Sequence, residues 1–242
     1  MNRMLGDNKL ARVAGAVYLI VVITGIFNLA YVPSQINVRG DIAGTIANIE
    51  SSMLLYRLGI AVGLISFSAY LLLPLALYRL LHHVNKQSAV LMVILAISSV
   101  PITFVGILNK VDILSLIAQA GYLQNLTTEQ LHFQVGLLLH SYSNNLLVSH
   151  IFWGLWLLPF GYLVYQSEFL PKLLGVFLML GCFGYLIDLF GRLIYPPFSS
   201  TLIGGYITAP ASIGEIGICL WLLLFGARRS LFNGSSPIMV GN

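Results

Sequence analysis

Several ionisable side chains of this sequence lie inside long apolar stretches, where such a group is costly and needs a partner or water. Asp188 and Arg192 stand four residues apart, so they share one face of a helix and can pair. Glu215 sits among small residues, and no basic residue lies within one helical turn of it. Carboxylates in such places can titrate or coordinate a solute, or they can hold neighbouring helices together.

The depth of these groups along their helices can be counted at about 1.5 Å per residue. Asp188 then lies about 10 Å, and Glu215 about 13 Å, below the outer membrane boundary. His150 and Asn28 lie roughly 6 Å below it. We therefore expect an outward-facing polar cavity, whose candidate ligand-binding residues are Asp188, Arg192, Glu215, His150, Asn28 and Asn145.

A purely structural role for the same residues is the alternative. In that case Asp188 pairs with Arg192, Glu215 takes His150 or a backbone donor, and nothing binds. We favour the structural role for the pair of Asp188 and Arg192 taken alone. For Glu215 the two roles stay open.

The composition indicates which solvent surrounds these groups. Hydrophobic residues make up 58% of the chain and charged residues only 8%, and the mean hydropathy is +0.89. A water-soluble domain needs roughly a quarter of its residues charged to cover its surface. The chain must therefore place its apolar surface in another solvent, and we expect the lipid bilayer to be its main partner.

Apolar runs long enough to cross a bilayer recur along the chain, and alternation at period two is absent. Because a helical span takes about 20 residues, we predict an all-α bundle of about six spans. The expected spans are residues 13–32, 58–81, 88–108, 146–165, 173–194 and 206–225. Together they form one transmembrane domain, residues 1–229, followed by a disordered tail, residues 230–242. Residues 128–145 form either an extension of the fourth span or a separate helix.

The distribution of Lys and Arg predicts the orientation, because these residues are retained on the cytoplasmic side. One side of the predicted bundle carries Arg3, Lys9, Arg12, Arg79, Lys86, Lys172, Arg228 and Arg229, and the other carries Arg39, Arg57, Lys110 and Arg192. We therefore expect both termini in the cytoplasm. A short amphipathic helix, residues 41–50, is expected on the outer surface. No aromatic and basic stripe of the kind that binds nucleic acid appears.

Motifs that would name a reaction, a metal or a cofactor are absent. His140 and His150 stand ten residues apart, which turns them about 80° away from each other on a helix. There is no His-Glu-x-x-His, Gly-x-Ser-x-Gly or Gly-rich phosphate loop. Cys182 and Cys219 are expected at similar depth, and we interpret them as small packing residues rather than as a disulfide or a metal pair. We expect no cofactor and no bound metal.

Short segments distributed in order over the chain resemble a known family. They are residues 11–27 (ARVAGAVYLIVVITGIF), 56–61 (YRLGIA), 76–81 (ALYRLL), 84–86 (VNK), 169–176 (FLPKLLGV), 184–188 (GYLID), 214–215 (GE) and 220–223 (LWLL). The set is similar to the prokaryotic multi-pass membrane family called domain of unknown function 4386, over about residues 10 to 227. The resemblance implies a bacterial or archaeal cytoplasmic-membrane protein, and it supplies no catalytic residues.

Three classes of function fit these observations. The first is a protein that binds or transports a small solute or a lipid through the polar cavity. The second is an intramembrane enzyme, with or without a metal, that uses His140, His150, Asp188 and Glu215. The third is an accessory protein that works with a membrane partner or as a homo-oligomer. We place binding or transport narrowly ahead of catalysis.

Overall fold

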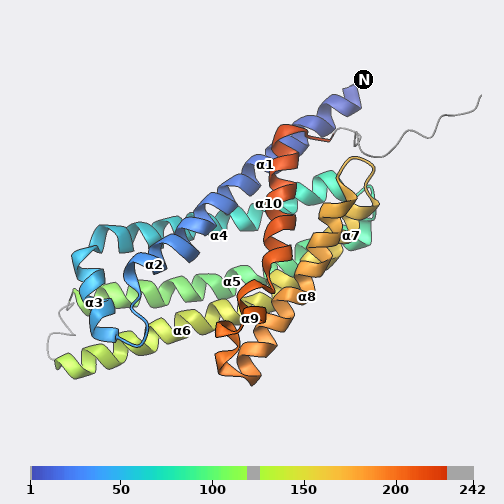
Figure 1. The fold of residues 1–242 in the computed structure, drawn as a ribbon. Helices are drawn as coiled ribbons and strands as arrows, with labels where there is room; N and C mark the ends of the chain where they lie inside the picture. Colours follow the sequence, from blue (N-terminus) through green and yellow to red (C-terminus); the bar gives the residue numbers. More distant parts are fainter. Residues whose placement is uncertain (1, 119–125, 228–242) are drawn as a thin grey trace, which may run out of the picture.

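The structure, a computed structural model, describes residues 2–118 and 126–227 (Figure 1). The tail at residues 230–242, for which disorder was expected, lies outside the described residues. The helices are α1 (Asn2–Ile26), η1 (Phe27–Tyr31), α2 (Val32–Ile36), α3 (Ile42–Ser51), α4 (Met53–Leu81), α5 (Lys86–Ile117), α6 (Thr128–Leu155), α7 (Leu157–Gln166), α8 (Lys172–Ile194), η3 (Pro196–Ser200), α9 (Leu202–Tyr206) and α10 (Ala209–Leu224).

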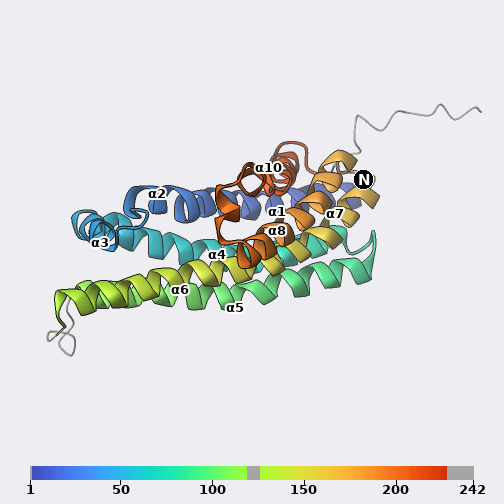
Figure 2. The same cartoon turned by 60° about the horizontal axis from the view of Figure 1, so that its bottom comes forward.

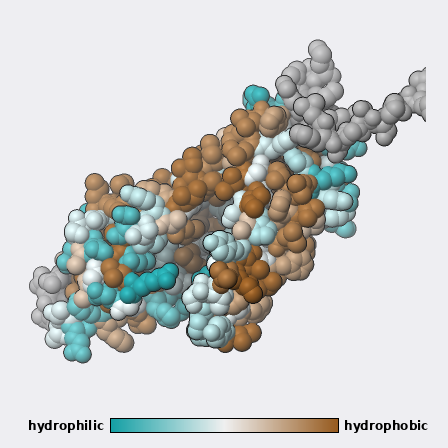
Figure 3. Space-filling model, in the orientation of Figure 1, coloured by the Kyte–Doolittle hydropathy of each residue, from teal (hydrophilic) through white to brown (hydrophobic). Residues whose placement is uncertain are grey.

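Within the described residues, six helical segments are long and apolar enough to cross a membrane, which confirms the predicted number of spans and the all-α class. They are Asn8–Ile36, Met53–Leu81, Lys86–Ile117, Thr128–Gln166, Lys172–Ile194 and Leu202–Leu224. Large apolar side chains face outward along them, and Ile94 in α5, for example, is 57% exposed. Figure 3 shows such residues over the middle of the molecule and polar ones toward its two ends. This is the surface that a bilayer requires.

The first span continues beyond the proline at which the sequence predicted its end. Pro33 lies in α2, directly after the π-helical segment η1. The five residues of η1 before it are π-helical, so α1, η1 and α2 follow one another without a break to Ile36. π-helical segments are rare and occur often at functional sites.

Two other spans are longer than the apolar runs that predicted them. Helix α5 continues through Lys110 and Asp112 to Ile117. Helix α6 begins with a capping box, in which the Thr127 hydroxyl accepts from Gln130 N and the Gln130 side chain accepts from Thr127 N. Residues 128–145 thus belong to the same continuous helix as the start of the fourth predicted span.

The short amphipathic helix expected at residues 41–50 is α3. Asp41 caps it, since its carboxylate accepts a hydrogen bond from the backbone nitrogen of Gly44 at 2.8 Å. Ile46 and Ile49 on its inner face are buried against the bundle. The helix therefore closes one end of the bundle beside α2 and α6.

The long helices pack mainly with their neighbours in sequence. α4 lies along α1 and α5, and α5 lies along α6 (Figure 2). The second half of the chain adds α7 and α10, which both pack on α8, and α10 also contacts α1. The first and last spans thus meet, and they cross each other in Figure 1.

Glycines make the closest helix contacts possible. A Cβ atom on Gly161 of α7 would lie 2.6 Å from the carbonyl oxygen of Gly175 in α8, and one on Gly181 would lie 2.6 Å from Cα of Ala211 in α10. Backbones that approach this closely gain van der Waals contact, which drives helix association where lipid surrounds the protein.

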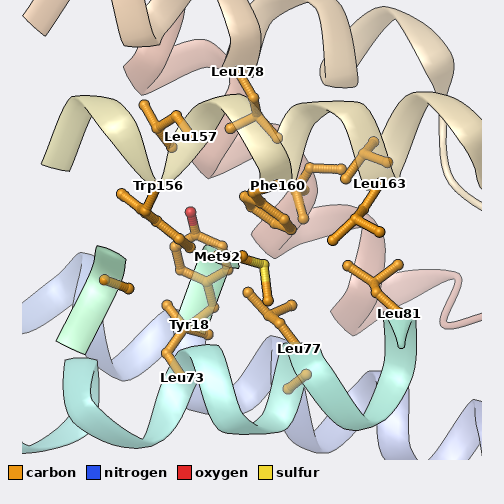
Figure 4. Packing of buried hydrophobic residues seen from close by; sticks show 14 of the residues in the cluster. Tyr18, Leu73, Leu77, Leu81, Met92, Trp156, Leu157, Phe160, Leu163 and Leu178 are labelled. Atoms are coloured by element: carbon orange, nitrogen blue, oxygen red, sulfur yellow. The ribbon is translucent and has the colours of Figure 1, made fainter. Parts of the chain in front are cut away.

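Two apolar clusters fill the interior. One surrounds Tyr18, Met92 and Phe160 and joins α1, α4, α5, α7, α8 and α10, as the close view in Figure 4 shows in part. The other surrounds Ile49 and Ile107 and lies toward the α3 end of the bundle. The polar groups described next lie between or beside these clusters.

Both ends of the described chain lie at one end of the bundle. The backbone nitrogen of Ala227 donates to Oδ1 of Asn8 at 3.1 Å. The loops between α4 and α5 and between α7 and α8 meet there too, since the rings of His83 and Phe169 stack at 6.0 Å. The chain therefore crosses the bundle an even number of times.

Candidate functional site

A buried carboxylate in α8 joins two basic side chains. Asp188 is fully buried, and its Oδ1 accepts a hydrogen bond of 2.8 Å from Nε of Arg192, one turn further on. Nδ1 of His150 in α6 lies 3.1 Å from Oδ2 of Asp188, which is close enough for an ion pair but not aligned as a hydrogen bond. We call His150, Asp188 and Arg192 the Asp188 cluster.

The Asp188 cluster fastens α6 to α8. The ring of His150 also packs against Trp153 at 5.5 Å and against Tyr185 at 5.2 Å. A buried ion pair adds little net stability, but removal of one partner leaves an uncompensated charge. The described contacts of Asp188 are therefore sufficient for a structural role, and its carboxylate needs no further cation.

Glu215 has a different environment. It is half-buried in α10, and its Oε1 accepts a hydrogen bond of 3.2 Å from the hydroxyl of Tyr18 in α1. Among the described residues, no Lys, Arg or His forms an ion pair with it. Its carboxylate is therefore held by one neutral donor.

Glu215 lines a cavity of about 340 Å³ between five of the spans. The wall is apolar except for a few hydroxyl groups, and six aromatic side chains contribute to it. The lining residues are Tyr18, Val21, Val22, Gly25, Ile26, Leu29, Ala30, Ser66, Phe67, Tyr70, Trp153, Trp156, Tyr185, Ser212, Glu215 and Ile216. Figure 3 shows this face of the molecule hollowed between α1 and the segment of α9 and α10.

A second tyrosine of this cavity, Tyr70, is held in place by the packing of its ring. The ring of Tyr70 in α4 lies edge-on to Trp156, with ring centres 5.7 Å apart, and Trp156 is 1% exposed. The hydroxyl oxygen of Tyr70 is buried and has no hydrogen-bond partner among the described residues. Because a buried hydroxyl without a partner is costly, it is a group that a ligand or water would satisfy.

The structure brings some of the predicted site residues together and separates others. His150, Asp188 and Arg192 form one cluster, and Tyr185 lies between that cluster and the Glu215 cavity, since it contacts His150 and lines the cavity. Asp188 itself does not line the cavity.

Asn28 and Asn145 lie elsewhere. Asn28 is fully buried in η1, where its Oδ1 accepts from Nζ of Lys110. Nδ2 of Asn145 donates to the carbonyl oxygen of Ser141 on its own helix, and the residue borders a separate depression between α5 and α6. The six candidate residues therefore do not line a single cavity.

The groups that enzymes use for metal or nucleophile chemistry are not assembled here. No group of three His, Cys, Asp or Glu side chains in the described residues could hold a metal ion. Cys182 and Cys219 are buried free thiols, and Sγ of Cys219 donates weakly to the carbonyl oxygen of Gly15 at 3.8 Å. His140 is exposed and takes no part in the Asp188 cluster.

The sequence reasoning missed Tyr18, Tyr70 and Lys110. Tyr18 and Tyr70 lie within predicted spans, and Lys110 lies just beyond the end of the third. A buried tyrosine hydroxyl usually finds a hydrogen-bond partner. The same depth count that singled out Glu215 could have been applied to tyrosines in the first two spans.

The six apolar spans and the buried polar sites between them define a multi-pass α-helical membrane protein. The family described as Domain of unknown function (DUF4386) matches residues 13–226, which is most of the chain. The chain belongs to this family, as the resemblance of its segments predicted.

A relative with a similar stretch is an uncharacterized protein of Archaeoglobus fulgidus. The two are 34% identical over 85 residues, which cover 34% of this chain and 47% of that protein. The match thus spans about half the length of the relative. No solved structure matches the chain.

Proposed function

We propose that the protein binds a small hydrophobic organic cation in the Glu215 cavity. The observation that carries this proposal is a carboxylate that has no cationic partner among the described residues and that lies in a cavity walled by aromatic rings. Such a group needs a positive charge or a proton at membrane depth.

The aromatic wall supports a cation as the occupant. Ammonium groups are attracted to the faces of Trp, Tyr and Phe rings, and quaternary ammonium ligands are recognised by cages of such rings. Tyr18, Tyr70 and Trp153 lie on three different helices around Glu215 and offer such rings. The volume falls at the lower end of the range of about 300 to 1,000 Å³ that small-molecule pockets occupy. The ligand is therefore small, with an apolar body and one charge.

The Asp188 cluster supports the ligand site indirectly. Its carboxylate accepts from Arg192 at Oδ1 and lies beside His150 at Oδ2, and Asp188 does not line the Glu215 cavity, so it does not compete for the ligand. It instead fixes His150, whose ring packs against two side chains of the cavity wall, Trp153 and Tyr185.

For the location we propose a prokaryotic cytoplasmic membrane, with the end that holds both chain ends in the cytosol. Arg79, Lys86 and Lys172 lie at that end, beside the loops that meet there. Lys and Arg are retained on the cytoplasmic side during insertion, which supports this orientation.

The experiment uses benzyltrimethylammonium as the probe and the intrinsic tryptophan fluorescence as the signal. Trp153 and Trp156 line the cavity, whereas the third tryptophan, Trp221, donates to the carbonyl oxygen of Phe169 outside it. We expect saturable quenching in the full-length protein in neutral detergent micelles. Glu215→Gln keeps the shape of the side chain and removes its charge, so the probe should bind at least about tenfold more weakly.

The matched control is Glu50→Gln, which removes one negative charge from the exposed face of α3. It should bind the probe as the wild type does. If Glu215→Gln bound the probe as tightly as Glu50→Gln, the proposed cation site would be wrong.

A further inference from the structure

A second buried charge lies in α5, toward the other end of the molecule. Lys110 is only 6% exposed, although lysine is almost never fully buried without a partner. It lies two residues beyond the predicted end of the third span, and in the structure it belongs to the continuous helix α5. Its charge therefore requires an explanation.

The described neighbours of the Lys110 ammonium group are neutral. Nζ donates to Oδ1 of Asn28 at 3.2 Å and lies over the ring of Tyr142, 4.3 Å from its centre. Both contacts stabilise a cation, and neither supplies a negative charge.

No carboxylate compensates this charge within the described part of the chain. The ion pairs found there involve Asp188 and not Lys110. Asp112 follows two residues later, which turns it about 200° around the helix, and it is exposed. Asp41, at the start of α3, is occupied with the capping bond to Gly44.

Lys110 lines a cavity of about 410 Å³ between α2, α3, α4, α5 and α6. Tyr142 and Tyr56 line the same cavity, together with exposed polar side chains of α6, His140 and Ser143. Within the described part of the chain, the buried hydroxyl of Tyr142 forms no direct hydrogen bond, although the side chain of Asn28 lies close to it. The ammonium group of Lys110 and the hydroxyl of Tyr142, which can donate a hydrogen bond, thus border the same cavity.

The position along α5 indicates what reaches this hollow. Lys110 lies 24 residues after Lys86, so it is about 36 Å along the helix, beyond the roughly 30 Å of the hydrocarbon core. That depth is the level of lipid head groups. Asn28, which positions the ammonium group, lies in the π-helical segment η1.

We propose that this cavity binds a phosphate group, with Lys110 as its counter-ion and the Tyr142 hydroxyl as a second donor. The phosphate belongs either to an anionic phospholipid or to a free anion, and the depth of Lys110 favours the lipid. The site is separate from the Glu215 cavity and does not depend on the function proposed for it.

The test measures thermal unfolding of the delipidated full-length protein in neutral detergent, with three additions. They are phosphatidylglycerol, zwitterionic phosphatidylcholine and inorganic phosphate. A ligand that binds only the folded protein raises the midpoint temperature. We expect phosphatidylglycerol to raise it more than phosphatidylcholine does. An equal rise with inorganic phosphate would assign the site to a free anion.

Lys110→Gln should lose the specific increase, and Lys110→Arg should keep it. The control is Lys172→Gln, because Lys172 also lies over a tyrosine ring, that of Tyr165, but is exposed at the opposite end. This control should respond as the wild type does. Tyr142→Phe keeps the ring under Lys110 and removes the hydroxyl, so it should reduce the increase even if Lys110→Gln does not fold.

Two results would overturn the proposal. One is a wild-type protein that neither phosphatidylglycerol nor inorganic phosphate stabilises more than phosphatidylcholine does. The other is a full increase in Lys110→Gln or, should that variant not fold, in Tyr142→Phe. Binding of benzyltrimethylammonium by Lys110→Gln should stay unchanged, which separates this test from that of the Glu215 cavity.

Discussion

Tyr18 in the first span and Glu215 in the last are joined by a hydrogen bond of 3.2 Å between the phenol hydroxyl and Oε1. The bond connects α1 to α10, and both residues line the same cavity. Among the described residues, this hydrogen bond is the side-chain contact that holds the carboxylate of Glu215. The position of the proposed ligand site therefore depends on how α1 and α10 pack. Substitutions can test this relationship and the contacts around it.

Tyr18→Phe removes the hydroxyl and leaves the carboxylate of Glu215 without a donor. Hydrogen bonds to charged groups contribute about 1.5 to 3 kcal/mol, so we expect the free energy of unfolding in detergent to fall by an amount in this range. Tyr206→Phe, at a residue that is 73% exposed, should have no measurable effect. Equal stability of the two variants would mean that the bond does not hold the helices together.

Asp188→Asn should destabilise the protein more than any substitution of a single exposed charge. Arg192 and His150 would then keep their positions without the carboxylate between them. Loss of one member of a buried ion pair costs about 3 to 5 kcal/mol, which denaturant unfolding can measure. Asp112→Asn removes an exposed carboxylate as a control. A similar small change in both variants would contradict a structural role for the Asp188 cluster.

Gly181→Ala tests the contact between α8 and α10. The added methyl group would lie 2.6 Å from Cα of Ala211, so the helices must separate, and overpacking of this kind costs about 1 to 3 kcal/mol. Gly205→Ala is the matched control, because no atom lies within 4 Å of the Cβ position there. We expect a lower midpoint of thermal unfolding for the first variant alone. If both variants unfold together with the wild type, the helices are not in close contact at Gly181.

The proposed orientation can be tested with single cysteines, because Cys182 and Cys219 are buried. Gln87→Cys lies at the end that holds the termini, and Ser200→Cys lies in η3 toward the opposite end. In intact cells a membrane-impermeant maleimide should label the Ser200→Cys variant, and it should label Gln87→Cys only after lysis. The reverse pattern would invert the orientation.

The sequence predicts the number of spans well, because that number depends only on the length and the apolar composition of each run. It predicts their ends less well. The first span was predicted to end before Pro33, but the helical segment continues through this proline to Ile36. The third span was predicted to end at residue 108, yet Lys110 is buried by neighbouring side chains within α5. The ends of the spans depend on contacts between helices, and the sequence of a single helix does not show these contacts.

For the site, the sequence predicts the level of each residue along its helix, but it does not predict which neighbour the residue faces. Counting along the helices placed Asp188 and His150 at nearby levels, and in the structure they are in contact. Asn28 was counted at a level similar to that of His150, but its face of the first span turns toward α5 and Lys110. The rotation of each helix about its axis follows from packing, so the sequence could not show that Glu215 pairs with Tyr18.

The most direct measurement compares benzyltrimethylammonium with neopentylbenzene, its uncharged carbon isostere, by equilibrium binding to the wild-type protein in detergent micelles. The two probes have almost the same shape and differ by one positive charge. If Glu215 provides the counter-charge, the cation should bind at least about tenfold more tightly, and Glu215→Gln should abolish the difference. Equal binding of the two probes by the wild-type protein would contradict a cation site in this cavity.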